Sequence, residues 1–189
     1  MKAIFKWIVL PMCLTLSAGV ALGASPSPGD EVLTGIVLPT PETPEHRDYL
    51  GLGEKSSFKI PDISADVVII EIFSMYCPHC QREAPSVNKL FQKIEGDSKL
   101  KDRVRLIGIG IGNSDFEVGF FKKTFDVPFP LFSDGKYVIH KKLGEVRTPY
   151  FMAIKLRKDG THRIFYSKLG GIRSPDQFLN MIRGEMKSK

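Results

Sequence analysis

The chain has 189 residues, 42% of them hydrophobic and 25% charged, an ordinary globular composition whose length suits one domain with additional ends. Its formal net charge of +6 is mildly basic, but the lysines and arginines are interleaved with acidic residues, as between positions 99 and 105. Because no basic cluster with interleaved aromatic residues occurs, nucleic-acid binding is not expected.

The first residues have the layout of a secretory signal peptide. Two lysines are followed by an apolar core over residues 7–16 and then by small residues that end in Ala21-Leu22-Gly23-Ala24. We expect a signal peptide over residues 1–23, since cleavage after Gly23 leaves small residues at both required positions. The alternative is an uncleaved membrane anchor, because residues 7–24 are close to the length that spans a bilayer.

Residues 24–45 are rich in proline, serine, threonine and glycine and are expected to form a linker. Its apolar patch, residues 32–38, is the part that we expect to dock on a single domain formed by residues 46–189. Within this domain the strongest predicted strand is Val67–Phe73, because a continuous β-branched and aromatic run is typical of a strand buried on both faces.

The rest of the domain is predicted to alternate between strands and helices. Short extended segments are expected at residues 49–52 and 57–60, and further strands at residues 103–111, 127–132, 150–157 and 161–167. Helices are expected from the cysteines to Gly96 and at residues 115–125, 137–143 and 176–186. The helix over residues 115–125 is expected to place Phe116, Phe120 and Phe121 on one side. The predicted class is α/β, with a central mixed sheet flanked by helices.

Of the three cysteines, Cys13 lies in the expected signal peptide, so Cys77 and Cys80 are left as a pair. An even number of cysteines in an exported protein suggests a disulfide. A gap of two residues closes too small a loop to stabilise a domain, because the entropic benefit of a crosslink grows with loop length. The pair is therefore predicted to be reactive rather than structural.

Cys77-Pro78-His79-Cys80 lies where the buried strand leads into a helix. The unpaired backbone N–H groups and the positive dipole end of that helix favour a thiolate. We predict that Cys77 is the exposed nucleophile with a lowered pKa and that Cys80 is the resolving thiol. His79 can carry a positive charge that stabilises the thiolate further. A redox-active disulfide between Cys77 and Cys80 needs no organic cofactor.

A metal site is the competing interpretation, since Cys-x-x-Cys also forms half of a zinc site. A closed zinc site needs four ligands, and the other candidates form no second ligand pair. These are His46, His79, His140 and His162. We therefore expect no metal, and a metal-binding or copper-delivery protein is the alternative from a different functional class.

The stretch from Ser74 to Cys80 closely resembles the active site of the thioredoxin superfamily, and its Pro-His pair is the one typical of DsbA-like oxidases. The resemblance spans most of residues 46–186. It implies that Glu71 is a buried acid that moves protons to and from the resolving cysteine, and that Pro85 kinks the active-site helix.

Thr148-Pro149 resembles the residue and cis-proline that lie beside the cysteines in this superfamily and bind extended substrate backbone. Tyr76 and Pro78, which flank Cys77, complete the expected substrate-binding set.

The scaffold is similar to one branch of this superfamily, the TlpA/ResA and peroxiredoxin-related proteins. A DsbA-like oxidase carries a large helical insertion between its active-site helix and its cis-proline, for which this chain has no room. Glu83-Ala84-Pro85 and residues 125–130 with Ser133-Asp134-Gly135 are also similar to that branch. The branch contains mostly membrane-tethered or periplasmic reductants, some serving cytochrome c maturation. A peroxiredoxin itself is not expected, because its peroxidatic cysteine loop has no counterpart here.

These features predict a secreted, periplasmic thiol–disulfide oxidoreductase with TlpA/ResA-like architecture. Its expected partners are cysteine-containing protein substrates and a redox partner protein, soluble or membrane-bound. The direction of electron flow stays open, because the Pro-His pair is typical of an oxidant and the scaffold of a reductant. A reductant dedicated to cytochrome c maturation is the alternative within the same class.

Overall fold

The computed structural model describes residues 33, 35–157 and 159–188. The predicted signal peptide over residues 1–23 therefore lies outside the described residues, as does the first part of the predicted linker. None of the helices in the described residues is long and apolar enough to cross a membrane.

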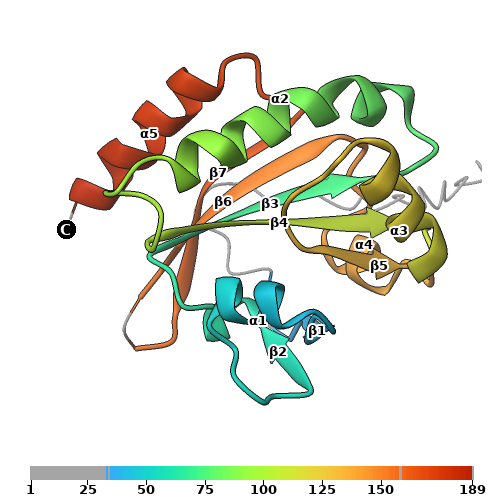
Figure 1. Cartoon of the computed structure of the whole chain (residues 1–189), viewed down its shortest axis with the longest axis horizontal. Helices are drawn as coiled ribbons and strands as arrows, with labels where there is room; N and C mark the ends of the chain where they lie inside the picture. The colour runs from blue at the N-terminus through green and yellow to red at the C-terminus, as the bar shows by residue number, and fades with distance from the viewer. Residues whose placement is uncertain (1–32, 34, 158, 189) are drawn as a thin grey trace, which may run out of the picture.

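The centre of the fold is a five-stranded mixed sheet with the strand order β5-β4-β3-β6-β7 (Figure 1). Strands β3 (Val67–Phe73), β4 (Val104–Ile111) and β5 (Leu131–Asp134) are parallel to one another. Strand β6 (Tyr150–Leu156) is antiparallel to β3, and β7 (His162–Leu169) is antiparallel to β6. The mixed sheet with a final hairpin agrees with the prediction.

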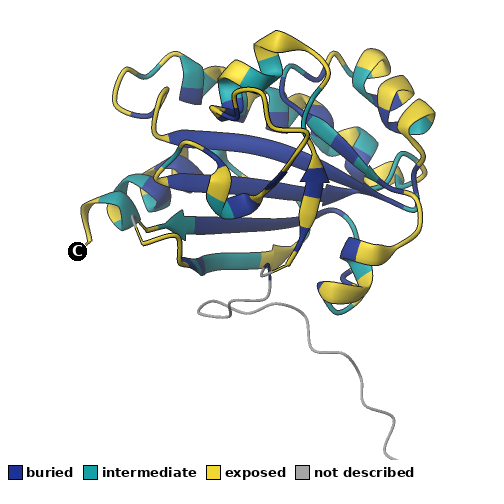
Figure 2. Cartoon of the chain, turned by 90° about the horizontal axis from the view of Figure 1, so that it is seen from below, coloured by how far each residue is buried: buried dark blue, intermediate teal, exposed yellow. Residues whose placement is uncertain are grey.

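The two faces of the sheet bury separate hydrophobic clusters, because successive side chains of a strand point to opposite faces. Val67, Ile69 and Phe73 of β3 pack with α2 (Pro78–Glu95), α3 (Asp115–Thr124) and α5 (Pro175–Lys187). Val68, Ile70 and Ile72 face the other way, and every residue of β3 is buried (Figure 2). The continuous apolar run thus lies on the middle strand, which needs apolar residues on both sides.

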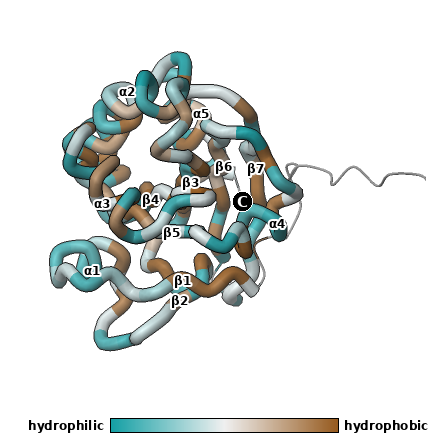
Figure 3. Tube along the Cα trace, turned by 90° about the vertical axis from the view of Figure 1, so that its right-hand side faces the viewer, coloured by the Kyte–Doolittle hydropathy of each residue, from teal (hydrophilic) through white to brown (hydrophobic). Residues whose placement is uncertain are grey.

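The second face is covered by the N-terminal part of the chain and by a short helix. Strands β1 (Val37–Pro39) and β2 (Ser57–Lys59) pair with each other, and α1 (Pro44–Leu50), the 3-10 turn Ile60–Asp62 and α4 (Val138–Lys142) complete this layer. Figure 3 shows the hydrophobic sheet between α2 and α5 on one side and β1 and β2 on the other.

The N-terminal layer differs from the prediction in two ways. Leu33, Ile36 and Leu38 are fully buried, so the apolar patch does dock, but the expected domain boundary at residue 46 falls inside α1. Residues 49–52 were expected to be extended, whereas Tyr49 and Leu50 form the last turn of α1. Pro44 suits the first helical turn and Gly51, at φ 68°, ends the helix in the left-handed region.

Two later elements also differ. Pro128 and Pro130 have no N–H to donate to β4, and β5 begins only at Leu131 rather than at residue 127. The expectation that Phe116, Phe120 and Phe121 share one side of α3 is wrong. Phe121 is buried, while Phe116 is 82% and Phe120 54% exposed. At about 100° per residue, positions 116 and 120 share a face and position 121 lies on another.

Candidate active site

The turn that carries Cys77, the predicted nucleophile, is held from both sides. Cys77 is the N-cap of α2, and its N–H donates to the carbonyl of Ser74 at 3.0 Å. The N–H of Met75 donates to Oδ1 of the buried Asn113 at 2.8 Å, and Nε2 of Gln81 donates to the carbonyl of Met75 at 2.8 Å. The position of Cys77 is therefore set by hydrogen bonds from β3, α2 and the end of β4.

The two cysteines are free thiols in unequal environments. Partial burial acts to raise the pKa of Cys77, but hydrogen bonds from the Thr148 side chain, from Cys80 and from the backbone of His79 outweigh it and leave this pKa lowered. Burial raises the pKa of Cys80, and the negative charges of Cys77 and Glu71 raise it further. Cys77 is thus the group that ionises first, as a nucleophile must, and Cys80 holds its proton.

Glu71 lies in the middle of β3 and is only 3% exposed. Its place in the strand, two residues from both Ile69 and Phe73, puts its side chain on the face that α2 covers. Burial, and then the charges of Glu83 and Cys77, raise its pKa to about 8. Among the described residues its Oε1 has no hydrogen-bond partner. A buried carboxyl with such a pKa can hold or release a proton near neutral pH.

Thr148 and Pro149 lie beside Cys77 although they are far away in the chain. The peptide bond between them is cis, and Sγ of Cys77 lies 3.5 Å from the carbonyl oxygen of Thr148. The carbonyl of Pro149 accepts a hydrogen bond from the N–H of Gly170 at 2.8 Å. The structure therefore brings the expected substrate-binding loop to the cysteines.

Three further predicted site residues, Tyr76, Pro78 and His79, are exposed around Cys77. The hydroxyl of Tyr76 hydrogen-bonds to the carboxylate of Glu117 on α3. Nδ1 of His79 lies 2.8 Å from Nη2 of Arg82. A guanidinium has no acceptor, so Arg82 donates and Nδ1 accepts. Arg82 therefore places a positive charge beside the motif, and the backbone of His79 is one of the groups that lower the pKa of Cys77.

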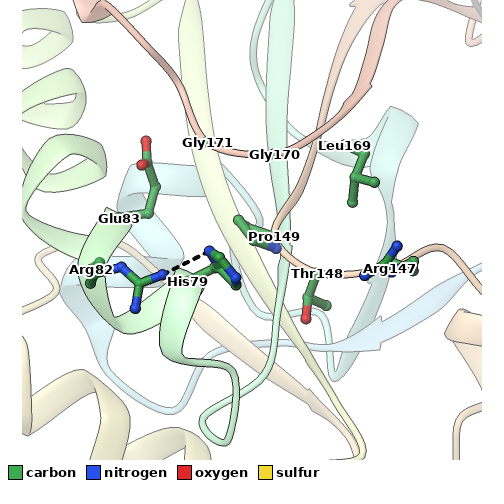
Figure 4. Close-up of a pocket in the computed structure, with 9 residues that line it drawn as sticks. All are labelled: His79, Arg82, Glu83, Arg147, Thr148, Pro149, Leu169, Gly170 and Gly171. Atoms are coloured by element: carbon green, nitrogen blue, oxygen red, sulfur yellow. Dashed lines mark hydrogen bonds between the residues drawn. The ribbon is translucent and has the colours of Figure 1, made fainter.

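A pocket of about 310 Å³ opens next to this turn (Figure 4). It lies between the start of α2 and the loops around Pro149 and Gly170. Its lining residues are His79, Arg82, Glu83, Arg147, Thr148, Pro149, Leu169, Gly170 and Gly171.

Several of these residues were not among the sequence-based candidates. The sequence indicates Glu83 only as part of a family motif. In the structure its Oε1 accepts a hydrogen bond from the N–H of Ile172 at 2.6 Å, and this bond joins α2 to the loop after β7. Its spacing of three from Cys80, one helical turn, is the signal that could have indicated it. Arg147 directly precedes Thr148, and Arg82 lies three residues after His79, but Gly170 and Gly171 carried no signal.

Within the described part of the chain, no three His, Cys, Asp or Glu side chains are grouped so that they could hold a metal ion.

Comparison with known proteins adds the family. The AhpC/TSA family profile matches residues 46–168, which is more than half of the chain. The chain belongs to the AhpC/TSA family. It is 26% identical over 107 residues to the thiol-disulfide oxidoreductase ResA of Bacillus thuringiensis subsp. konkukian (strain 97-27). That match covers 57% of this chain and 58% of the relative, so this chain spans somewhat more than half of the relative's length.

Solved structures share the fold at low identity. A secreted disulfide oxidoreductase of Mycobacterium tuberculosis, homologous to DsbE of E. coli, has a TM-score of 0.56 at 17% identity, over 82% of this chain and 98% of that one. StoA from Bacillus subtilis has a TM-score of 0.56 at 19% identity, over 79% of this chain and 98% of that one. These structures confirm the predicted thioredoxin-type fold, and the match to ResA confirms the TlpA/ResA-like resemblance.

Proposed function

We propose that this protein is an extracytoplasmic thiol–disulfide oxidoreductase that exchanges disulfides with protein substrates through Cys77 and Cys80. The observation that carries the proposal is the opposite shift of two thiol pKa values within one helical turn. The pKa of the accessible Cys77 is lowered and that of the buried Cys80 is raised. The matched relative ResA is named a thiol-disulfide oxidoreductase, which supports the same chemistry.

In the reducing direction, the Cys77 thiolate attacks one sulfur of a substrate disulfide. A bond forms between Cys77 and that sulfur, the substrate S–S bond breaks, and the departing substrate thiolate takes up a proton. The Cys80 thiol then loses its proton and attacks Sγ of Cys77. The Cys77–Cys80 disulfide forms, the mixed disulfide breaks, and the second substrate thiolate is released and protonated. Two electrons pass from the cysteine pair to the substrate disulfide.

The proton of Cys80 needs an acceptor, because burial keeps this thiol protonated. Glu71 is the buried carboxylate whose charge acts on Cys80, and we assign it this role. In the oxidising direction every step is reversed, and Glu71 returns the proton to Cys80. No organic cofactor enters either direction, and a redox partner protein with its own dithiol or disulfide restores the starting state.

A dedicated reductant is a second candidate within this class. The TlpA/ResA-like scaffold favours it, whereas the lowered pKa of Cys77 stabilises the reduced form and thus makes the disulfide a stronger oxidant. The extracytoplasmic location rests on the signal-peptide pattern and on the secreted M. tuberculosis protein that shares the fold. An oxidising compartment suits a reactive disulfide.

Insulin reduction tests the activity directly. With dithiothreitol as the electron source, the protein is expected to accelerate insulin precipitation, and the Cys77→Ser variant is expected to lose this effect. A purified reduced protein that carries stoichiometric zinc or copper and leaves insulin disulfides intact would instead support the metal-binding alternative.

Equilibration with glutathione then separates an oxidant from a reductant. A redox potential above about −270 mV, the value of thioredoxin, is expected from the stabilised thiolate. A value at or below it would favour the dedicated reductant.

A further inference from the structure

Positive charge surrounds the pocket beside the cis-proline loop. Arg82 and Arg147 line the pocket, and Lys168 and Arg173 line an adjoining hollow of about 330 Å³. The two hollows share Glu83 and residues 169–171, so they lie on either side of one short segment. All four cations are exposed, and within the described residues none of them forms a salt bridge.

The one acidic residue that lines these hollows is bound to the loop after β7 rather than to a cation. The Oε1 of Glu83 accepts a hydrogen bond from the N–H of Ile172, and among the described residues Glu83 forms no salt bridge. Figure 4 shows Glu83 and Arg82 on the side of α2, with Arg147 beyond Thr148 on the other side of Pro149. An extended substrate segment that crosses the pocket would therefore have Arg82 on one side and Arg147 on the other.

We infer that the protein substrate carries acidic residues next to its reactive cysteine, and that Arg82, Arg147, Lys168 and Arg173 recognise them. This inference rests on the proposed function, because the hollows adjoin the nucleophile through Thr148. The pocket volume of about 310 Å³ is at the small end for ligand sites and suits side chains of an extended segment. The guanidinium group of arginine can bind a carboxylate through two parallel hydrogen bonds. Cations without a salt-bridge partner at a site also steer anionic partners toward it.

The test uses three peptides that are identical except for the residues around one cysteine of an internal disulfide. These flanking residues are glutamates, lysines or glutamines. The full protein is reduced, mixed with each peptide at low ionic strength, and quenched with acid, and the peptide thiols are measured by chromatography. We expect the glutamate peptide to be reduced about tenfold faster than the lysine peptide, with a ratio that approaches one at high salt.

Charge reversal locates the effect. The double variant Arg147→Glu, Arg173→Glu is expected to lose or invert the preference for the glutamate peptide. Lys123→Glu, also a reversal from positive to negative charge but on the exposed end of α3, is expected to keep this preference. Circular dichroism checks that each variant is folded. The single variant Arg147→Glu is measured as the one-residue counterpart of Lys123→Glu. Two results would overturn the inference and leave the oxidoreductase function standing. One is equal reduction rates for the glutamate and lysine peptides, and the other is a loss of preference in Lys123→Glu as large as in Arg147→Glu. Failure to reduce any peptide, the glutamine one included, would contradict the proposed function itself.

Discussion

Sγ of Cys77 lies 3.5 Å from the carbonyl oxygen of Thr148, although the two residues are 71 positions apart in the chain. The sheet register explains this contact. Strand β3 ends just before the Cys77 turn, and β6 begins just after Pro149 and runs antiparallel to β3 with Ile72 opposite Tyr150. The end of β3 and the start of β6 therefore meet at the same end of the sheet, and Cys77, the predicted nucleophile, is placed against the loop that is expected to bind substrate.

Replacing the resolving cysteine should trap the substrate. In Cys80→Ser the mixed disulfide at Cys77 forms but has no internal thiol to resolve it. Substrates should therefore accumulate as covalent adducts on non-reducing gels, and Cys77→Ser should form none. The assignment of the nucleophile is wrong if Cys77→Ser retains full exchange activity while no adduct appears on Cys80→Ser.

The thiolate of Cys77 should be present at a lower pH than in an ordinary cysteine. Its pKa is lowered from 9.0 because the hydrogen bonds at the start of α2 and from Thr148 outweigh its burial. Alkylation of Cys80→Ala by iodoacetamide, followed against pH, should show a midpoint below 9.0. Thr148→Val, which removes the side-chain hydroxyl, should raise this midpoint toward the unfolded value. A midpoint that is the same in folded and urea-unfolded protein would contradict the geometry.

Glu71 should make the reduced protein less stable as the pH rises. The folded chain keeps the Glu71 proton up to a pKa of about 8, whereas the unfolded chain loses it near 4.5. Between these values the folded state binds more protons, so the free energy of unfolding falls with pH, by at most on the order of 1 kcal/mol per pH unit. Urea midpoints measured from pH 5 to 9 should show a smaller fall in Glu71→Gln than in the wild type. Equal slopes would show that Glu71 does not titrate in this window.

The same variant should slow the resolving step. Glu71→Gln cannot take the proton of Cys80, and loss of a general base costs about 10²-fold or more in rate. Stopped-flow release of thiol from a preformed Cys77 mixed disulfide measures this step alone. An unchanged rate would assign the proton acceptor to solvent or to another group.

The loop after β7 should not tolerate a side chain at position 171. A Cβ on Gly171 would overlap the Glu83 carboxylate, which is held in place by the N–H of Ile172. Gly171→Ala should therefore cost about 1–3 kcal/mol of stability, a range typical of overpacking. In a Glu83→Ala background the same change should cost much less, because the two residues are coupled. Additive effects in urea unfolding would rule out this contact as the cause.

Where sequence reasoning failed, the missing information was the packing of one element on another. Residues 49–52 look extended by composition, yet Tyr49 belongs to α1, where its hydroxyl accepts a hydrogen bond from the N–H of Leu106 on β4. Phe116 and Phe120 were expected to share one side of α3 with the buried Phe121, because an aromatic residue gives no sign of which partner, if any, covers it. Arg82, which the sequence did not single out, lies beside the motif through its contact with His79.

The sequence by itself determined the strand, turn and helix around Cys77-Pro78-His79-Cys80, the presence of Glu71 within a buried strand, and the α/β class. These features can be predicted from contiguous residues, because the patterns that indicate a buried strand, a helix start and a stabilised thiolate each extend over only a few positions. Only the tertiary structure decided what else surrounds the cysteines. The resemblance to a family motif predicted Thr148-Pro149 beside them, but Arg147 and the loop at Gly170 are brought there by strand pairing across the sheet, and such non-local contacts leave no local pattern in the chain.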